Sequence, residues 1–333
     1  MTEKVTEAQA PMDRIRAEGI VDRINAYLSG GVSVTRICAE CEGGIRSDQL
    51  EKLMSEQALR PLTLGDWFGS PRATETLISL EKWADEEDRD NERQLDDYAV
   101  TEIFRQVYGI LNVAHKARSL VAITGTYGVG KTFAARRYAM DNPRRPNEPG
   151  AVWFEFPPGT KGDSGVLDAV LSALDPYGAP SGSVNAKLDR VLTLLKPGDF
   201  LIADECGLPA EKGTGLRFMA YIHERARVPI AMIGNPSFHA AVWGKRTDYD
   251  ALASRTRHTP LDGNSAEDVA HFMDWLNLSG RRLKDSILAV VRQPGRDGGL
   301  RGAVTVLNEL KAREMEVTAE NFISIAKQYG RME

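Results

Sequence analysis

One short segment combines the residue types that hold a triphosphate. It reads Gly125-Thr126-Tyr127-Gly128-Val129-Gly130-Lys131-Thr132. The glycines let successive backbone N–H groups surround phosphate oxygens, the lysine can reach the β- and γ-phosphates, and the last threonine can hold Mg²⁺. Apolar residues 120–123 precede the segment and a helix-forming run, 133–140, follows it, so the loop would end at a helix N-terminus, where anions bind. We therefore expect a site for ATP or GTP together with Mg²⁺.

Two adjacent carboxylates follow a second apolar segment. Residues 200–203 form a short, continuous apolar run, which is typical of a parallel strand covered on both faces. Ligands of such sheets sit beyond the carboxyl ends of the strands, where Asp204 and Glu205 emerge. We expect Asp204 to hold Mg²⁺ through its water shell and Glu205 to polarise the water that attacks the γ-phosphate. The alternative is a solvated acidic turn without a catalytic role.

The composition limits the class of protein. A length of 333 residues is enough for about two or three domains, and 42% hydrophobic with 27% charged residues indicates a mainly globular chain. No apolar stretch approaches the about 20 residues that span a bilayer, and the first residues lack a signal-peptide core, so we expect a cytoplasmic protein without membrane contact. The net charge of −5 disfavours a uniformly basic surface for nucleic acid but allows local basic strips.

Helix and strand patterns alternate over residues 98–262, which predicts a parallel sheet between two helical layers. Besides the two runs above, the strand pattern occurs at 151–156 and 230–234, and a fifth strand is expected at 258–261. The remaining residues, 263–333, have a helical pattern, which predicts a small C-terminal lid.

Short helical patterns separated by glycines occupy the N-terminal residues 1–60. A helical run over 12–28 ends at a Ser-Gly-Gly sequence, and further helices are expected at 34–41 and 47–54. Two short helices around a glycine turn predict a helix-turn-helix. The segment could bind DNA, or it could be a small helical bundle that contacts protein.

Residues 61–97 look like a connector between this domain and the core. Their acidic part, 81–97, is expected to be a solvated helix face. Cys38 and Cys41 form a lone Cys-x-x-Cys without a second pair of zinc ligands, so we expect them to be small buried side chains.

Two further features make the nucleotide site resemble that of AAA+ ATPases. The segment 230–234 ends in Asn235, an amide that can orient the attacking water beside the carboxylates, and Ser254-Arg255-Thr256-Arg257 ends a helix with exposed arginines. Within the AAA+ class, the chain resembles the family of phage Mu transposition protein B, the ATPases that accompany transposases. The resemblance includes the helix-turn-helix, the connector, Asn235-Pro236 and Ser254-Arg255.

The resemblance implies a P-loop NTPase (AAA+) fold of the α/β class, with a three-layer parallel-sheet core, an N-terminal helix-turn-helix domain and a C-terminal helical lid. It implies that Arg255, or Arg257 in its place, acts as an arginine finger on the ATP of a neighbouring subunit. It also implies that Arg301 contacts the γ-phosphate of its own subunit, although Arg301 could instead cap a loop.

The implied function is an ATP-dependent, largely sequence-independent DNA-binding ATPase. It would assemble with ATP as a ring or helical filament on double-stranded DNA, mark a transposition target and stimulate a transposase or integrase partner. Loops after the second and third strands would contact DNA phosphates through Thr160, Lys161, Lys212 and Arg217, unless they are ordinary surface loops. Two alternatives stay open, namely a replicative helicase loader and a transcriptional regulator whose ATP site switches its helix-turn-helix.

Overall fold

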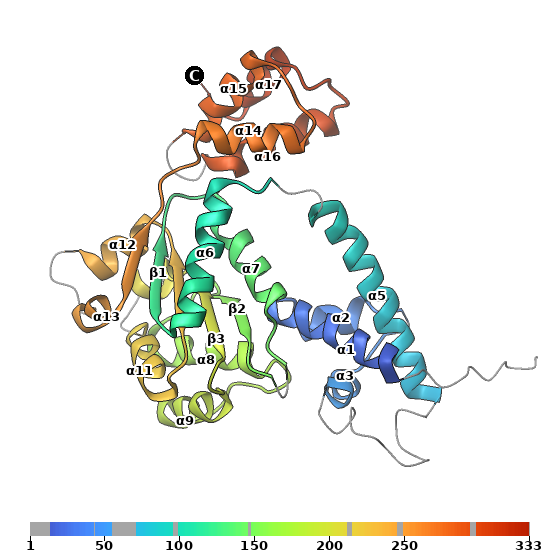
Figure 1. The fold of residues 1–333 in the computed structure, drawn as a ribbon, viewed down its shortest axis with the longest axis vertical. Helices are drawn as coiled ribbons and strands as arrows, with labels where there is room; N and C mark the ends of the chain where they lie inside the picture. Colours follow the sequence, from blue (N-terminus) through green and yellow to red (C-terminus); the bar gives the residue numbers. More distant parts are fainter. Residues whose placement is uncertain are drawn as a thin grey trace, which may run out of the picture.

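A parallel sheet lies at the centre of the computed structural model (Figure 1). The structure describes residues 14–42, 44–54, 71–95, 99–145, 148–211, 215–244, 249–293 and 298–332. The strands are β1 (Leu120–Thr124), β2 (Ala151–Glu155), β3 (Phe200–Asp204), β4 (Ile230–Gly234) and β5 (Arg257–Pro260). All five are parallel and lie in the order β2-β3-β4-β1-β5. The predicted α/β class with a parallel sheet is therefore confirmed.

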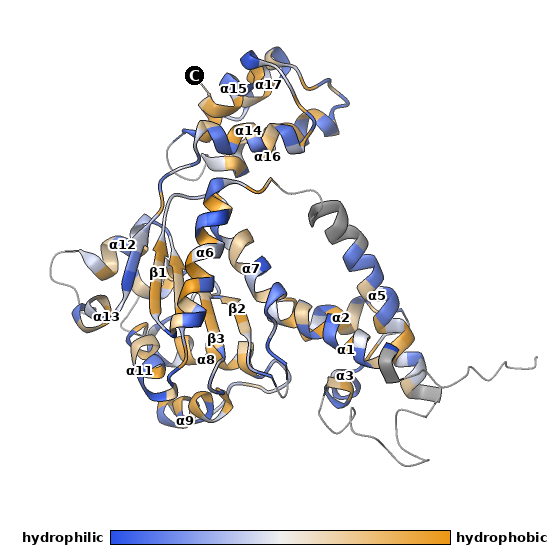
Figure 2. Ribbon diagram, in the orientation of Figure 1, coloured by the Kyte–Doolittle hydropathy of each residue, from blue (hydrophilic) through white to orange (hydrophobic). Residues whose placement is uncertain are grey.

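Helices cover both faces of the sheet, which explains why its inner strands are apolar throughout. Val121 and Ile123 of β1 pack with α6 (Glu102–Ala117) and α7 (Lys131–Asp141) on one face. The alternate residue Ala122 belongs to the core of the other face. The helices of that layer are α8 (Gly162–Leu174), α9 (Val184–Leu194), α10 (Gly207–Glu211), α11 (Arg217–Ala226), α12 (Pro236–Trp243) and α13 (Asp250–Arg255). The edge strand β5 is hydrophilic, in contrast to β1 and β3 (Figure 2).

The C-terminal helices form a small unit above the carboxyl end of the sheet (Figure 1). They are α14 (Ala266–Trp275), α15 (Arg281–Val291), α16 (Gly299–Ala312) and α17 (Ala319–Gln328). Their buried side chains, including Phe272, Ile287 and Phe322, form a core of their own. The predicted helical lid is therefore present. None of the helices in the described part of the chain combines the length and apolar character needed to cross a membrane.

Three N-terminal helices lie where the glycine-separated patterns predict them. They are α1 (Arg14–Ser29), α2 (Val34–Glu40) and α3 (Ser47–Met54), and they share a core to which Ile24 and Leu50 belong. Cys41 is buried in this core, as predicted, whereas Cys38 is only partly buried. The assignment of α2 and α3 as a helix-turn-helix stays a prediction, as do the proposed domain limits.

A long helix, α5 (Pro71–Leu95), occupies much of the expected connector. Its residues Leu77 and Trp83 are buried in the N-terminal core, so α5 packs as part of that unit. Its acidic side chains form ion pairs, and these join Glu81 to Arg16, Asp85 and Asp88 to Arg23, and Glu87 to Arg36. The expected solvated face holds for Asp85 and Asp88, which are 52% and 42% exposed, whereas the paired Glu81 and Glu87 are only 21% and 16% exposed.

A buried carboxylate at the amino end of the sheet pairs with an arginine that follows α7. Asp199 is fully buried and accepts hydrogen bonds from Arg144 Nε at 3.0 Å and from the backbone N–H of Lys196 at 2.8 Å. The Arg144 guanidinium also donates to the carbonyl oxygens of Leu174 and Leu194, which end α8 and α9. Arg144 thus holds two helix C-termini against the turn that starts β3.

We expect the Asp199→Ala substitution to lower the free energy of unfolding by about 3 kcal/mol, because it removes the fully buried partner of Arg144, whose side chain is only 17% exposed. Urea and thermal unfolding would measure the change. Arg282→Ala is a suitable control, since Arg282 pairs with Glu320 in solvent at 73% and 61% side-chain exposure. That pair should contribute less than about 1 kcal/mol. Equal losses in the two variants would contradict the structural role of Asp199.

Candidate nucleotide-binding site

The phosphate loop connects the end of β1 with the start of α7, as its sequence predicts. Gly128 and Gly130 have positive φ angles of 73° and 107°, a region that glycine occupies without steric cost. Lys131 lies buried under the loop, and its Nζ donates to the carbonyl oxygens of Gly125 at 2.9 Å and Thr126 at 2.7 Å. Burial lowers the pKa of Lys131 to about 8, although the nearby carboxylates oppose the shift. A triphosphate would give this ammonium group anionic partners in place of neutral carbonyls.

Asp204 ends β3 and is 2% exposed. One carboxylate oxygen, Oδ1, accepts the backbone N–H of Glu205 at 2.8 Å. The other, Oδ2, is buried without a hydrogen-bond partner among the described residues. Burial raises the pKa of Asp204, while the Thr132 side chain and the charge of Lys131 act in the opposite direction. An unpartnered carboxylate oxygen beside a threonine hydroxyl fits Mg²⁺, a hard cation that prefers oxygen ligands.

Glu205 follows directly with an uncommon backbone conformation. Its φ of 53° lies in the left-handed region, which costs a residue with a Cβ about 1 kcal/mol. Such strained positions cluster at functional sites. Burial, followed by the charge of Asp204, raises the pKa of Glu205. A carboxylate with a raised pKa is a better acceptor for a proton from water.

Asn235 lies at the N-terminus of α12 and caps that helix. Its Oδ1 accepts hydrogen bonds from the backbone N–H groups of Ser237 and Phe238 at 3.0 and 3.2 Å. Its Nδ2 donates to the hydroxyl of Tyr127 at 2.7 Å, which ties β4 to the phosphate loop. The amide is therefore fixed beside the site, and its role in orienting water stays a prediction.

A cavity of about 310 Å³ gathers these side chains at the carboxyl edge of the sheet. From the predicted set, its lining contains Tyr127, Gly128, Val129, Gly130, Lys131, Thr132, Asp204, Glu205, Asn235 and Arg301. Phe133 and Arg136 of α7 also line the cavity and were not predicted. Helical spacing is a signal for Arg136, because it lies four positions after Thr132 and therefore on the same face of α7; Phe133 has no such signal.

The lid contacts the phosphate loop directly. The backbone N–H of Arg301 donates to the carbonyl oxygen of Gly128 at 3.2 Å. A Cβ atom on Gly128 would lie 2.8 Å from the carbonyl oxygen of Gly298 and 2.9 Å from Cβ of Arg301. Only glycine allows this approach. The side chain of Arg301 thereby reaches the cavity from α16, where the sequence places it.

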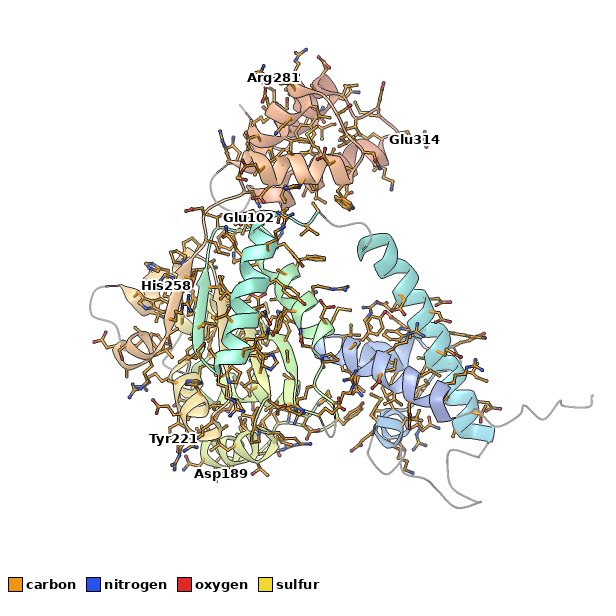
Figure 3. All side chains as sticks on the ribbon, viewed as in Figure 1. Glu102, Asp189, Tyr221, His258, Arg281 and Glu314 are labelled. Atoms are coloured by element: carbon orange, nitrogen blue, oxygen red, sulfur yellow. The ribbon has the colours of Figure 1, made fainter. Side chains whose placement is uncertain are left out.

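Two buried polar residues that we did not predict reinforce this contact. Asn264 donates to the carbonyl oxygen of Val129 and accepts the backbone N–H of Leu300, both at 3.3 Å. Asp268 accepts the backbone N–H of Glu102, the first residue of α6, at 2.6 Å. Figure 3 shows Glu102 at the junction between the core and the lid. Asn264 and Asp268 hold the lid to the phosphate loop and to α6.

Arg255 and Arg257 do not line the cavity of their own chain. Arg255 ends α13, where its Nε lies 2.5 Å from Oε1 of Glu224 and its guanidinium also donates to the carbonyl oxygen of Ala251 at 2.8 Å. Arg257 pairs in register with Val121 on the edge strand β5. A contact between either arginine and a nucleotide would require a second chain, so the finger role stays a prediction.

The residues expected to contact DNA differ in their exposure to solvent. Thr160 is buried at 6% exposure and its hydroxyl donates to the carbonyl oxygen of Pro157 at 2.8 Å, so the structure contradicts its assignment as a surface contact. Lys161 and Arg217 are exposed. Their loops touch, because a Cβ on Gly215 would overlap the carbonyl of Gly162. Lys212 lies outside the described residues.

Comparison with known proteins agrees with this geometry. Residues 114–242 match the family model described as an AAA domain. None of the curated proteins compared with the chain matches its sequence. The AAA match covers the phosphate loop, Asp204, Glu205 and Asn235.

Several solved structures are similar to the chain. The RuvB Holliday junction branch migration motor of Thermotoga maritima is 15% identical, with a TM-score of 0.42 over 70% of each chain. The ORC2 protein of Aeropyrum pernix is 14% identical, with a TM-score of 0.46 over 67% of this chain and 66% of that one. Domain III of the Thermotoga maritima replication initiation protein DnaA is 16% identical, with a TM-score of 0.45 over 70% of this chain and 95% of that one. With the sheet order, the phosphate loop and the matched domain, the chain has the AAA+ P-loop NTPase fold.

Proposed function

We propose that this chain binds ATP with Mg²⁺ and hydrolyses it. The observation that carries the proposal is the convergence of Lys131, Asp204, Glu205 and Arg301 on one cavity. These residues come from the phosphate loop, from β3 and from the lid, and they supply two cations and two carboxylates. No other part of the described chain combines a phosphate loop with such carboxylates.

Each residue has a separate task in this proposal. Lys131 and the loop N–H groups neutralise the phosphate oxygens, and Thr132 and Asp204 hold Mg²⁺, which supplies further charge neutralisation during phosphoryl transfer. Glu205 orients the attacking water and accepts its proton, for which its raised pKa is suited. Arg301 adds positive charge from the lid, where negative charge develops in the transition state.

We further propose that the ATP-bound protein assembles on double-stranded DNA with little sequence preference. The support is the resemblance to the Mu transposition protein B family, together with the adjacent exposed residues Lys161 and Arg217. Such contacts bind phosphate without reading bases. In this proposal ATP builds a ring or helical filament, the assembly marks a target and stimulates a transposase or integrase, and hydrolysis dissolves it.

The ion pairs of α5 favour protein contact over base reading by the N-terminal helices. Arg16, Arg23 and Arg36 already pair with acidic residues of α5. The arginine just before α3, Arg46, pairs with Asp48 of that helix. Phosphate contacts by these arginines would first have to replace their exposed ion pairs within the chain, each of which contributes at most about 1 kcal/mol.

For the Glu205→Gln variant we expect unchanged ATP affinity and a loss of hydrolysis of about 10²-fold or more, because the metal ligand Asp204 remains while the proton acceptor is lost. Phosphate release and calorimetric titration would measure the two quantities. We also expect longer-lived assemblies on DNA. Hydrolysis at the wild-type rate would refute the role of Glu205.

The arginine finger can be tested by mixing two inactive variants. Arg255→Ala should bind ATP normally but lose DNA-stimulated hydrolysis, because the missing charge acts only across a subunit interface. Mixing it with Glu205→Gln should restore part of the activity, since the second subunit can offer its arginine to a neighbour with an intact Glu205. Mixed assemblies without recovery, or full activity of Arg255→Ala alone, would assign the role to Arg257.

Duplex binding should require ATP and weaken steeply with salt. Replacing Lys161 and Arg217 by alanine should reduce the slope of log K against log salt by about 2, since each phosphate contact contributes about 0.9. Fluorescence anisotropy with several unrelated duplexes would measure this. Replacing Lys311 and Lys327, two exposed lysines of the lid, by alanine is the matched charge control. Lys131→Ala should abolish duplex binding at any ATP concentration, because it removes the lysine that binds the phosphates. Tight binding of one operator at high salt, unaffected by these changes, would contradict the proposal.

A further inference from the structure

Two buried polar atoms that form no hydrogen bond of normal geometry with any described residue lie on the same face of the sheet. They are Oδ2 of Asp204 and the indole Nε1 of Trp153. Trp153 pairs in register with Ile202, and Asp204 pairs with Glu155. Because alternate residues of a strand point to one face, Trp153 and Asp204 are diagonal neighbours there. One atom is a donor and the other an acceptor, and the indole N–H of Trp153, like the Thr132 hydroxyl, lies near enough to the Asp204 carboxyl to lower its pKa, which burial raises.

The N-terminal unit, formed by α1, α2, α3 and α5, contacts the ring of the same tryptophan. The turn between α1 and α2 passes through Gly31, whose φ is 89°. A Cβ atom on Gly31 would overlap ring carbons of Trp153. The preceding residue, Gly30, approaches Met140 of α7 in the same way. Glycine is therefore needed at this turn for the N-terminal unit to lie against the sheet.

The other contact of Trp153 leads into the nucleotide cavity. The guanidinium carbon of Arg136 lies 4.0 Å above the centre of the tryptophan ring. Arg136 lines the cavity, and its guanidinium lies 3.7 Å from Glu155, the partner of Asp204 in the sheet. The tryptophan ring thus lies between a turn of the N-terminal unit and two groups of the candidate site.

We propose that Trp153 is a positioning residue for Asp204, and that Gly31 sets the position of Trp153. The proposal rests on the proposed binding of Mg²⁺ and ATP. In it, the indole N–H fixes one oxygen of the carboxylate so that the carboxylate meets the metal in one orientation. A displacement of the N-terminal unit moves the ring and changes the affinity for the metal. The N-terminal helices then act on the nucleotide site without touching the nucleotide.

The Trp153→Phe variant tests the first step, because it keeps an aromatic ring beside Gly31 and Arg136 while removing the N–H. We expect the Mg²⁺ concentration that gives half of the maximal ATP affinity to rise about 10-fold, the usual effect of losing a residue that supports a metal ligand. ATP affinity in the absence of Mg²⁺ should not change. Calorimetric titration at graded Mg²⁺ measures both, and circular dichroism checks that the variant is folded.

Gly31→Ala and Gly44→Ala form a matched pair for the second step. Both glycines belong to the N-terminal unit and have positive φ angles, 89° and 69°, so alanine strains the backbone at each. A Cβ on Gly44 would meet no described atom within 4 Å, whereas one on Gly31 would meet Trp153. We expect Gly31→Ala to shift the Mg²⁺ requirement like Trp153→Phe, and Gly44→Ala to leave it unchanged.

The outcomes separate this inference from the proposed function. If the wild-type protein binds ATP without any effect of Mg²⁺, the proposed function fails, and this inference fails with it. If the wild-type protein depends on Mg²⁺ and Trp153→Phe has the same requirement, only the inference is overturned. Equal shifts in the two glycine variants would also overturn it. If Trp153→Phe does not fold, the two glycine variants still test the inference. A rise in the Mg²⁺ requirement in Gly31→Ala but not in Gly44→Ala would support it, and no rise in Gly31→Ala would overturn it.

Discussion

All five strands of the sheet run in the same direction, and this constraint places the candidate site. Parallel strands bring their carboxyl ends to one edge, so the residues that follow β1, β3 and β4 become neighbours although long segments separate them in the sequence. Both faces of the inner strands are buried under helices, so the first polar side chains, such as Asp204, appear where the strands end. The phosphate loop, the carboxylates and Asn235 meet there for that reason.

The burial of the site also removes Lys131, Asp204 and Glu205 from water, which disfavours the charged form of each side chain. It lowers the pKa of Lys131 to about 8 and raises the pKa values of Asp204 and Glu205, so each group is less readily charged than it would be in water. Each partly compensates the other, since the carboxylates favour the ammonium form and the lysine favours the carboxylates. A ligand that brings phosphates and a cation adds partners for both signs. Such a ligand should also raise the thermal stability of the fold, because it binds only the folded state.

Local patterns predict much of this fold, and tertiary contacts decide the rest. The apolar runs of β1 and β3 and the glycines before Lys131 identify their structures, because buried strands and phosphate loops restrict the residues they accept. The burial of Thr160 could not be predicted, since it depends on how its loop turns back on Pro157. The packing of α5 depends on a core formed with helices far away in the sequence, and two of its ion-pair partners, Arg16 and Arg36, lie more than 50 positions away. Asn264 has no sequence signal because its partners, Val129 and Leu300, come from distant segments.

The single amide of Asn264 has a consequence for the timing of the catalytic cycle. It bonds the phosphate loop through its nitrogen and the start of α16 through its oxygen. A lid that swings away from the core must break at least one of these bonds, and the bond between Arg301 and Gly128 with it. Opening of the lid therefore loosens the loop that holds the phosphates. Release of the product nucleotide is therefore coupled to opening of the lid. A partner protein that binds the lid would then control the rate of product release from each subunit.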